Sequence, residues 1–193
     1  MNVLTQRGKW EEKDLRKGSW LVIALVLMLL AGCGGGGTKA DVPIFIMSST
    51  SMPGGAAEKL EAALVSKVGE APTVAVAVSP MFSLEKMIIE VAAAGNGILI
   101  LPGDQFRGLG KQGGYVPLDE LAKAEDFPDG VLELPVDGNP DGKLEKHLFG
   151  IPVEKTTWFA DLGLSGQDLY AFIPQNAPDI EKAKQVMKHI AQK

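Results

Sequence analysis

Cysteine and histidine are nearly absent from this chain of 193 residues, which holds one cysteine, Cys33, and two histidines. A single cysteine excludes an internal disulfide, a Cys-x-x-Cys redox pair and any zinc site built from several cysteines. A transition-metal site would need both His147 and His189, which stand far apart in the sequence, together with carboxylates. We therefore predict neither a metal site nor a cofactor.

Catalytic motifs are missing as well. The sequence has no Gly-x-Ser-x-Gly nucleophile elbow, and neither histidine stands in a recognisable catalytic motif. Gly108, Gly110, Gly113 and Gly114 lack the spacing and the Lys-Ser/Thr pair of phosphate-binding loops, so we expect a mobile loop there. The chain is predicted not to be an enzyme, because an envelope hydrolase would need a His–carboxylate–Ser cluster that no motif indicates.

A basic cluster is absent too. Residues 1–32 hold five basic and three acidic residues, and subtracting them from the totals of 19 and 24 leaves 14 basic and 21 acidic residues, a net charge of −7. An acidic body without clustered Lys or Arg lacks the electrostatic footprint of a nucleic-acid-binding protein. We expect no nucleic-acid partner, and we expect any membrane attachment to come from the N-terminus.

The longest apolar run is too short to cross a bilayer comfortably. Residues 20–31 are twelve apolar residues without a break, preceded by Arg16 and Lys17. A membrane-spanning helix takes about 20 such residues. The length of the run and its positive flank are instead typical of the hydrophobic region of a secretory signal peptide.

Leu30-Ala31-Gly32-Cys33 follows at the end of this run and resembles the bacterial lipobox. The resemblance implies that the Cys33 thiol carries a diacylglycerol and that cleavage after Gly32 makes Cys33 the mature N-terminus. Two acyl chains suffice for stable anchoring, whereas one binds only marginally. We expect a signal peptide over 1–32, a lipidated cysteine with a Gly-rich flexible tether over 33–41, and a protein held on the extracytoplasmic face of the cell membrane. The alternative is an uncleaved signal anchor with a buried, inert cysteine.

From residue 42 onward the apolar pattern alternates between strands and helices. Strands are predicted at 42–47, 73–78 and 97–101, with a helix at 56–68 and another that opens at Ser79-Pro80. In that second helix Leu84, Met87, Ile88 and Val91 form an apolar stripe. This rhythm indicates right-handed crossovers and strands buried on both faces. We predict an α/β fold, a three-layer αβα arrangement with a mainly parallel sheet, in a single domain over 42–193.

The second half of the chain is less regular. We expect a short turn and helix at 115–121, a loop-rich acidic stretch at 125–141, strands at 148–153 and 168–173, and a terminal helix at 178–191. Asp137–Gly142 matches the start of a calcium loop, but its twelfth position is Leu148 where a bidentate Glu is required. Asn-Pro and Asp-Gly are turn dipeptides, so a hairpin between 131–136 and 144–152 is the preferred interpretation.

Three stretches resemble, in the same order, the first lobe of bacterial extracellular solute-binding proteins of ABC importers. In that family a glycine precedes a P-L-D-x-L segment, and an L-[YF]-G-[IL]-P strand then enters the hinge. Here "GYVPLDEL" (114–121) and "LFGIP" (148–152) match these patterns, and "DLYAFIPQNAPDIEKAKQVMKHI" (168–190) is similar to the return strand and its helix. The resemblance implies one lobe of a periplasmic-binding-protein-like fold.

The chain departs from that family in one respect. Family members insert a second lobe after the hinge strand and grip the ligand between the two lobes. Here only fourteen residues, Glu154–Gln167, separate the hinge-like strand from Asp168. A second lobe does not fit there, so the resemblance implies a truncated, single-lobe relative and does not carry over capture between two lobes.

Candidate ligand-binding residues follow the predicted strands, because ligands of open α/β sheets bind at the carboxyl ends of the strands. Hydroxyl, amide, charged and aromatic side chains are expected to meet at this edge: Ser49, Thr50, Ser79, Asp104, Gln105, Glu154 and Trp158. The alternative is that the serines are helix N-caps and that Trp158 only covers the end of the sheet.

These features together predict a membrane-anchored, non-catalytic binding module for a small solute, an ABC permease or another envelope partner. The alternative is a structural or interaction lipoprotein that has lost solute binding together with the second lobe. The sequence leaves open the ligand, the partner protein, the oligomeric state and whether the host has one membrane or two.

Overall fold

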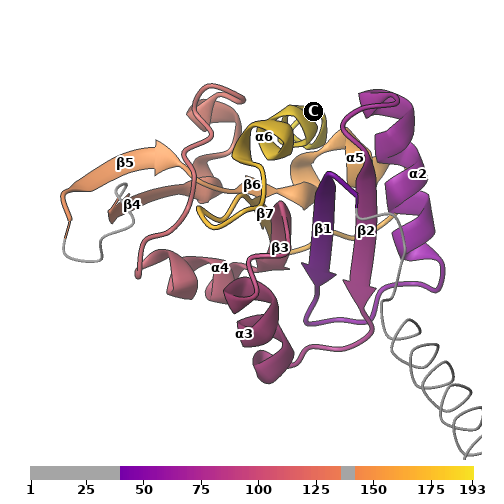
Figure 1. The fold of residues 1–193 in the computed structure, drawn as a ribbon, viewed down its shortest axis with the longest axis horizontal. Helices are drawn as coiled ribbons and strands as arrows, with labels where there is room; N and C mark the ends of the chain where they lie inside the picture. The colour runs from indigo at the N-terminus through magenta and orange to yellow at the C-terminus, as the bar shows by residue number, and fades with distance from the viewer. Residues whose placement is uncertain (1–39, 136–141) are drawn as a thin grey trace, which may run out of the picture. The chain divides into compact units, whose positions relative to one another are not determined.

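The computed structural model describes residues 40–135 and 142–193. The predicted signal peptide (1–32), the Gly32-Cys33 cleavage and lipidation site, and residues 137–141 of the candidate calcium loop lie outside the described residues. The part that is described has an α/β fold around a five-stranded sheet, and a separate two-stranded hairpin extends beside it (Figure 1).

The five-stranded sheet is mixed. Its order is β2 (Val74–Ser79), β1 (Val42–Met47), β3 (Ile98–Pro102), β7 (Leu169–Phe172) and β6 (Ile151–Pro152). The strands β2, β1 and β3 are parallel, whereas β7 runs antiparallel to both of its neighbours. The prediction of a mainly parallel sheet is therefore wrong.

The short connection from β6 to β7 explains this direction. A parallel neighbour needs a crossover that returns along the full length of the strands. The segment between β6 and β7 contains only a 3-10 turn, η3 (Val153–Lys155), and the four-residue helix α5 (Thr157–Ala160). These elements are too short to return along the sheet, so the chain turns at the carboxyl edge and β7 runs back.

The remaining helices are α2 (Ala56–Val68), α3 (Leu84–Ala92), α4 (Gly103–Gly110) and α6 (Ile180–Ile190), with short 3-10 turns η1 (Ala124–Asp126) and η2 (Pro128–Gly130). The predictions of α2 and α6 are confirmed. Residues 115–121 contain the expected turn but no helix, and Gly108 and Gly110 belong to α4 instead of a mobile loop. None of the helices in the described ranges is long and apolar enough to cross a membrane.

The helix α3 differs from its prediction both in the residue where it begins and in the side chains that it buries. It begins after Ser83, whose Oγ accepts a hydrogen bond from the Lys86 N–H at 3.2 Å, and not at Ser79-Pro80. Of the predicted apolar stripe only Met87 is buried, while Leu84 and Ile88 are exposed.

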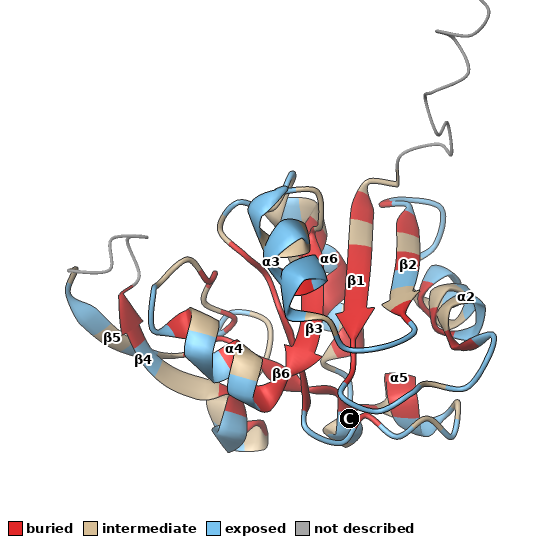
Figure 2. Cartoon of the chain, turned by 90° about the horizontal axis from the view of Figure 1, so that it is seen from below, coloured by how far each residue is buried: buried red, intermediate tan, exposed pale blue. Residues whose placement is uncertain are grey.

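Helices cover both faces of the sheet, and each face has its own core (Figure 2). The side chains of β1 alternate between the two cores, because successive side chains of a strand point to opposite faces of the sheet. Ile44 and Ile46 pack in the cluster that includes α2, α5 and α6. Phe45 and Met47 pack in the second cluster, which includes α3, α4 and the hairpin.

The two-stranded hairpin pairs β4 (Val131–Pro135) with β5 (Leu144–Leu148) in antiparallel register. The predicted hairpin is thereby confirmed for these residues, whereas Ile151-Pro152 joins the main sheet instead. The predicted loop-rich stretch 125–141 contains η2 and β4 within its described part.

A polar link fixes the first residues of the domain. The Asp41 carboxylate accepts hydrogen bonds from Lys182 Nζ at 2.6 Å and from the Thr73 N–H and hydroxyl at 2.9 and 2.7 Å. These hydrogen bonds hold the pKa of Asp41 well below its usual range. The bond from Lys182 has the largest effect, and the bonds from Thr73 follow. The link joins the start of β1 to the start of β2 and to α6.

The hairpin meets the main sheet at a close crossing of two backbone segments. The N–H groups of Phe149 and Gly150 both donate to the Gly130 carbonyl, at 3.0 and 3.2 Å. A Cβ atom on Gly130 would collide with the Gly150 carbonyl. Glycine at position 130 is therefore required by the approach of the two backbones.

We predict opposite effects for two glycine substitutions. Gly130→Ala should lower the free energy of unfolding by about 1–3 kcal/mol, because backbone must move to admit the methyl group. Gly108→Ala should raise it by about 0.5–1 kcal/mol, because position 108 lies in a helix with nothing within 4 Å of the added Cβ. Urea denaturation of the two variants and the parent measures both values. Equal stability of the two variants would contradict the close crossing.

Candidate functional site

A pocket of about 210 Å³ lies at the carboxyl edge of the sheet, where β1 and β3 end and β7 begins. Six of its eight lining residues are polar by type, and the lining comes from three segments: Ser48, Ser49, Thr50, Pro102, Ser165, Gln167, Asp168 and Leu169. Carboxyl edges of α/β sheets are the usual place for ligands, so this pocket is the first candidate site.

The turn after β1 presents hydroxyl groups to the pocket. Ser48 is buried, and its Oγ accepts a hydrogen bond from the Thr50 N–H at 3.1 Å and lies 3.3 Å from Thr50 Oγ1. Such side-chain-to-backbone bonds are typical of serine in tight turns. Ser48 therefore shapes the turn, while Ser49 and Thr50 are exposed at the mouth of the pocket.

Asp168 fixes the opposite wall. Its φ of 52° lies in the left-handed region, which aspartate tolerates better than most residues. Its carbonyl accepts the Gly103 N–H at 2.8 Å, and its carboxylate lies 4.0 Å from the Arg107 guanidinium. A Cβ on Gly103 would collide with that carboxylate and approach the Tyr170 ring at 2.8 Å. Close contact between the start of α4 and β7 thus orients Asp168.

Stacked aromatic rings pack against Arg107, the partner of Asp168 in this wall. Tyr170 stacks on Phe106 with ring centroids 5.0 Å apart, and the Arg107 guanidinium lies 5.7 Å from the Tyr170 ring centre. Burial is the largest cause that raises the pKa of the Tyr170 hydroxyl. The phenol therefore remains neutral and serves as packing under the charged pair of Arg107 and Asp168.

The structure brings together only part of the predicted site. Ser49 and Thr50 line the pocket. Asp104 and Gln105 follow β3 but bond to each other in the first turn of α4, at 2.9 and 3.1 Å. Ser79 donates to the Met81 carbonyl at 2.8 Å and lines a different pocket, beside residues 52–58. Glu154 is exposed in η3 and does not line the pocket.

Trp158 lies away from the pocket, contrary to the expectation of an aromatic plate at this edge. Its side chain is 1% exposed, and its Nε1–H donates to the Leu60 carbonyl of α2 at 3.0 Å. Its ring also meets Phe159 edge-on, with centroids 5.1 Å apart. The short helix α5 turns Trp158 inward against α2, so this residue belongs to the core.

Ser165, Gln167 and Asp168 were missed by sequence reasoning, although they line the pocket. They precede β7, and the residues before a strand lie at the carboxyl edge only when that strand is antiparallel to the others. The unusually short connection after Ile151-Pro152 was the available signal for the reversed direction.

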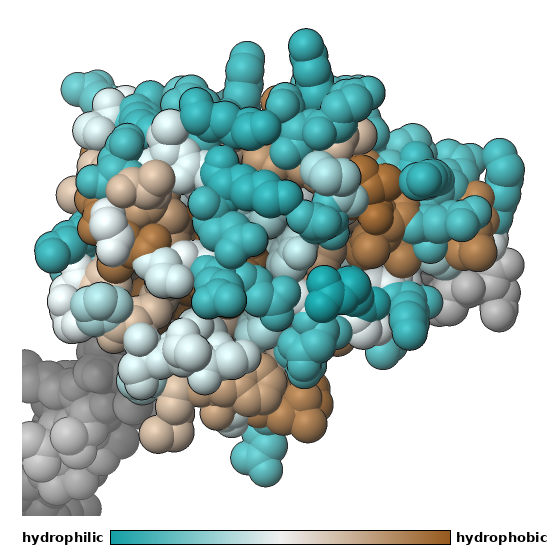
Figure 3. Space-filling view, turned by 180° about the vertical axis from the view of Figure 1, so that it is seen from behind, coloured by the Kyte–Doolittle hydropathy of each residue, from teal (hydrophilic) through white to brown (hydrophobic). Residues whose placement is uncertain are grey.

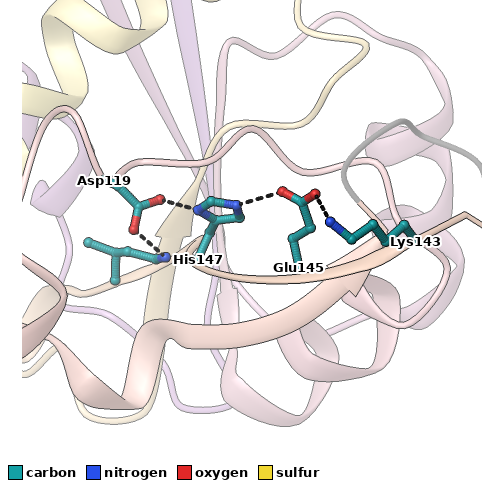
Figure 4. A network of polar contacts seen from close by, with 5 residues as sticks. Asp119, Lys143, Glu145 and His147 are labelled. Carbon is teal, nitrogen blue, oxygen red and sulfur yellow. Dashed lines mark hydrogen bonds and ion pairs between the residues drawn. The ribbon is translucent and has the colours of Figure 1, made fainter.

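A second polar cluster links the hairpin to the turn at 115–121 (Figure 4). His147 lies between two carboxylates, with Nδ1 3.0 Å from Asp119 and Nε2 3.2 Å from Glu145. Asp119 also accepts the Leu148 N–H at 3.2 Å, and Glu145 lies 3.1 Å from Lys143 Nζ. The hydrogen bond from His147, followed by that from Lys143, lowers the pKa of Glu145.

Both ring nitrogens of His147 are engaged within this cluster. The two carboxylates contact opposite nitrogens of the His147 ring, and no serine hydroxyl is hydrogen-bonded to that ring in the described part of the chain. Residues 40–135 and 142–193 contain no group of three or more His, Cys, Asp or Glu side chains that could hold a metal ion. Glu145 and His147 are two apart on β5 and share a face, which was the signal in the sequence.

The pocket at the carboxyl edge is the better candidate. Ser49, Ser165 and Gln167 are exposed there and make no side-chain hydrogen bond to any described residue, so their polar groups are available to a ligand. Comparisons with known proteins add nothing to this choice, because no family model, no curated protein and no solved structure matches the chain.

The burial of Trp158 gives a direct test. Trp158 is the only tryptophan after residue 33, so emission from the chain that begins at Cys33 reports on this side chain alone. We expect blue-shifted emission that iodide quenches weakly. Trp158→Phe should lower the free energy of unfolding by about 1–3 kcal/mol, because the buried Leu60 carbonyl loses its donor.

The matched control is Phe82→Leu, which shortens an exposed aromatic residue and should change stability by less than about 0.5 kcal/mol. Strong iodide quenching of Trp158 would contradict its assignment to the core.

Proposed function

We propose that this chain is a lipoprotein anchored through Cys33 on the extracytoplasmic face of the cell membrane, and that its α/β domain is a non-catalytic binding module. The anchor is supported by the apolar run at 20–31 and by the lipobox-like Leu30–Cys33.

The carboxyl-edge pocket is the single observation that carries the binding role. Its hydroxyls at Ser49 and Thr50 face a carboxylate at Asp168, which is paired with Arg107. A volume of about 210 Å³ is below the roughly 300–1,000 Å³ of sites for drug-sized ligands. A small polar solute with hydroxyl or ammonium groups fits this size and chemistry.

The resemblance to a single lobe of a solute-binding protein belongs to the same proposal. The strand that the resemblance identifies as entering the hinge contains β6, and the return strand contains β7. These two strands are direct neighbours at one edge of the sheet. Their adjacency is consistent with a hinge whose second lobe has been replaced by a short connection.

The anchor is tested by Cys33→Ala. We expect loss of metabolic labelling by a palmitate analogue and release of the protein from the membrane fraction, because the thiol that forms the thioether is gone. Ser66→Ala, which removes an exposed hydroxyl from α2, is the control and should label normally. Continued labelling of Cys33→Ala would refute lipidation at this residue.

Solute binding is tested by a thermal-shift screen of the protein against sugars, amino acids and short peptides. A ligand at a concentration of 100 Kd should stabilise the protein by about 2.7 kcal/mol. Asp168→Asn should weaken binding of that ligand about tenfold, which corresponds to the loss of about 1.4 kcal/mol from a charged contact. The control is Asp161→Asn, which changes an exposed aspartate at the C-cap of α5 and should leave Kd unchanged. No shift with any solute, together with unchanged uptake when the gene is deleted, would refute the solute role.

The second candidate is an interaction lipoprotein without a solute. Apolar side chains exposed on α3 favour it, because contiguous apolar surface often marks a site of association. A silent solute screen with full lipidation is the outcome that this candidate expects.

A further inference from the structure

Exposed apolar side chains concentrate on one short segment of the domain. Seven large apolar residues in the described part of the chain are exposed, and five of them lie within residues 81–89. Leu84, Ile88 and Ile89 belong to α3, and Met81 and Phe82 lie in the segment just before it; we call these five residues the α3 apolar face. Figure 3 shows apolar surface at the lower end of the molecule, where α3 lies.

The packing of α3 leaves this face without cover. The helix contacts the sheet through Met87, and Lys86 Nζ lies 5.4 Å from the centre of the Phe45 ring. Leu84 and Ile88 are 54% and 55% exposed, and Ile89 is 65% exposed. Apolar surface gathered in this way is unfavourable in water and indicates contact with another apolar phase.

The start of the domain lies close to the end of α3. The Gly97 N–H, in the loop after α3, donates to the Pro43 carbonyl at the beginning of β1, at 2.8 Å. Six residues lie between Cys33 and Ala40, so the seven peptide steps from one to the other span at most about 25 Å even when fully extended. A helix of nine residues such as α3 is about 13 Å long. A bilayer that holds Cys33 is therefore within reach of the whole α3 apolar face.

We propose that the α3 apolar face lies on the lipid bilayer that anchors the chain, an inference that rests on the proposed lipidation of Cys33. Amphipathic helices bind in this way, with the apolar side in the acyl boundary and the axis in the membrane plane. Attachment at Cys33 keeps the face at a high local concentration of lipid, so contacts too weak to recruit a free protein hold this one.

The negative charge of the domain favours membrane contact through apolar side chains over contact through charged ones. The part of the chain after residue 32 is acidic, so anionic headgroups do not attract it, and α3 itself carries Glu85, Lys86 and Glu90. In this orientation the sheet face covered by α2, α5 and α6 points away from the membrane.

The test uses environment-sensitive probes on the full lipidated protein in vesicles of phosphatidylcholine and phosphatidylglycerol. Acylation blocks the thiol of Cys33, so an introduced cysteine is the single reactive site. Leu84→Cys and Ile89→Cys report on the α3 apolar face, and Val65→Cys is the matched control, an exposed apolar position of α2 on the opposite face of the sheet.

We expect blue-shifted emission, protection from iodide and quenching by lipid-borne nitroxide at positions 84 and 89, and none of these at 65. Adding Ile88→Asp should abolish the protection at 89.

The outcomes separate this inference from the anchor on which it rests. Palmitate-analogue labelling reports the anchor alone, and its absence from Cys33 would overturn both proposals. Normal labelling with equal iodide quenching at 65, 84 and 89 would overturn the inference and leave the anchor standing. Protection that appears without vesicles and grows with protein concentration would assign the face to a second copy. Protection that appears only in native membranes would assign it to a protein partner. Each of these last two results overturns the lipid contact.

Discussion

The antiparallel pairing of β7 with β3 is the constraint on which the candidate site depends. β3 is completely buried between two neighbours and two cores, and its last residue, Pro102, pairs with Leu169. Because β7 runs backwards, its first residues meet the carboxyl ends of β1 and β3. Asp168 thereby reaches Gly103 and closes the pocket opposite the hydroxyls of Ser49 and Thr50. A parallel β7 would place residues 173 and 174 at this edge and leave the pocket without the carboxylate of Asp168.

Local patterns in the sequence predict local structure well in this chain. The helix at 56–68 and the strands at 42–47 and 97–101 follow from side-chain periodicity, which depends only on neighbouring residues. The direction of β7 depends instead on what the preceding connection can span, and the inward turn of Trp158 depends on α2, almost a hundred residues earlier. α4 contains three glycines and so lacks intrinsic helix propensity, and its packing through Phe106 overrides this.

The proposed tether joins the domain at the amino edge of the sheet, whereas the pocket opens at the carboxyl edge. The chain enters the domain at the amino end of β1, and the pocket opens at its carboxyl end. With α3 on the bilayer the strands would run along the membrane surface, because α3 packs against the sheet between β2 and β3 and returns along the strands. The pocket would then open sideways, toward proteins embedded in the same membrane, instead of toward the outside.

The link of Asp41 to Thr73 and Lys182 also has a mechanical meaning. Any pull between the membrane and the domain would enter the fold at Asp41, the residue immediately before β1. The force would act along β1, which is paired with β2 and β3 on both sides, so many backbone hydrogen bonds would share the load in shear. Resistance to forced unfolding is set by the unfolding rate and not by equilibrium stability. If the chain is anchored as proposed, the hydrogen bonds of Asp41 would transmit part of this load to the residue before β2 and to α6.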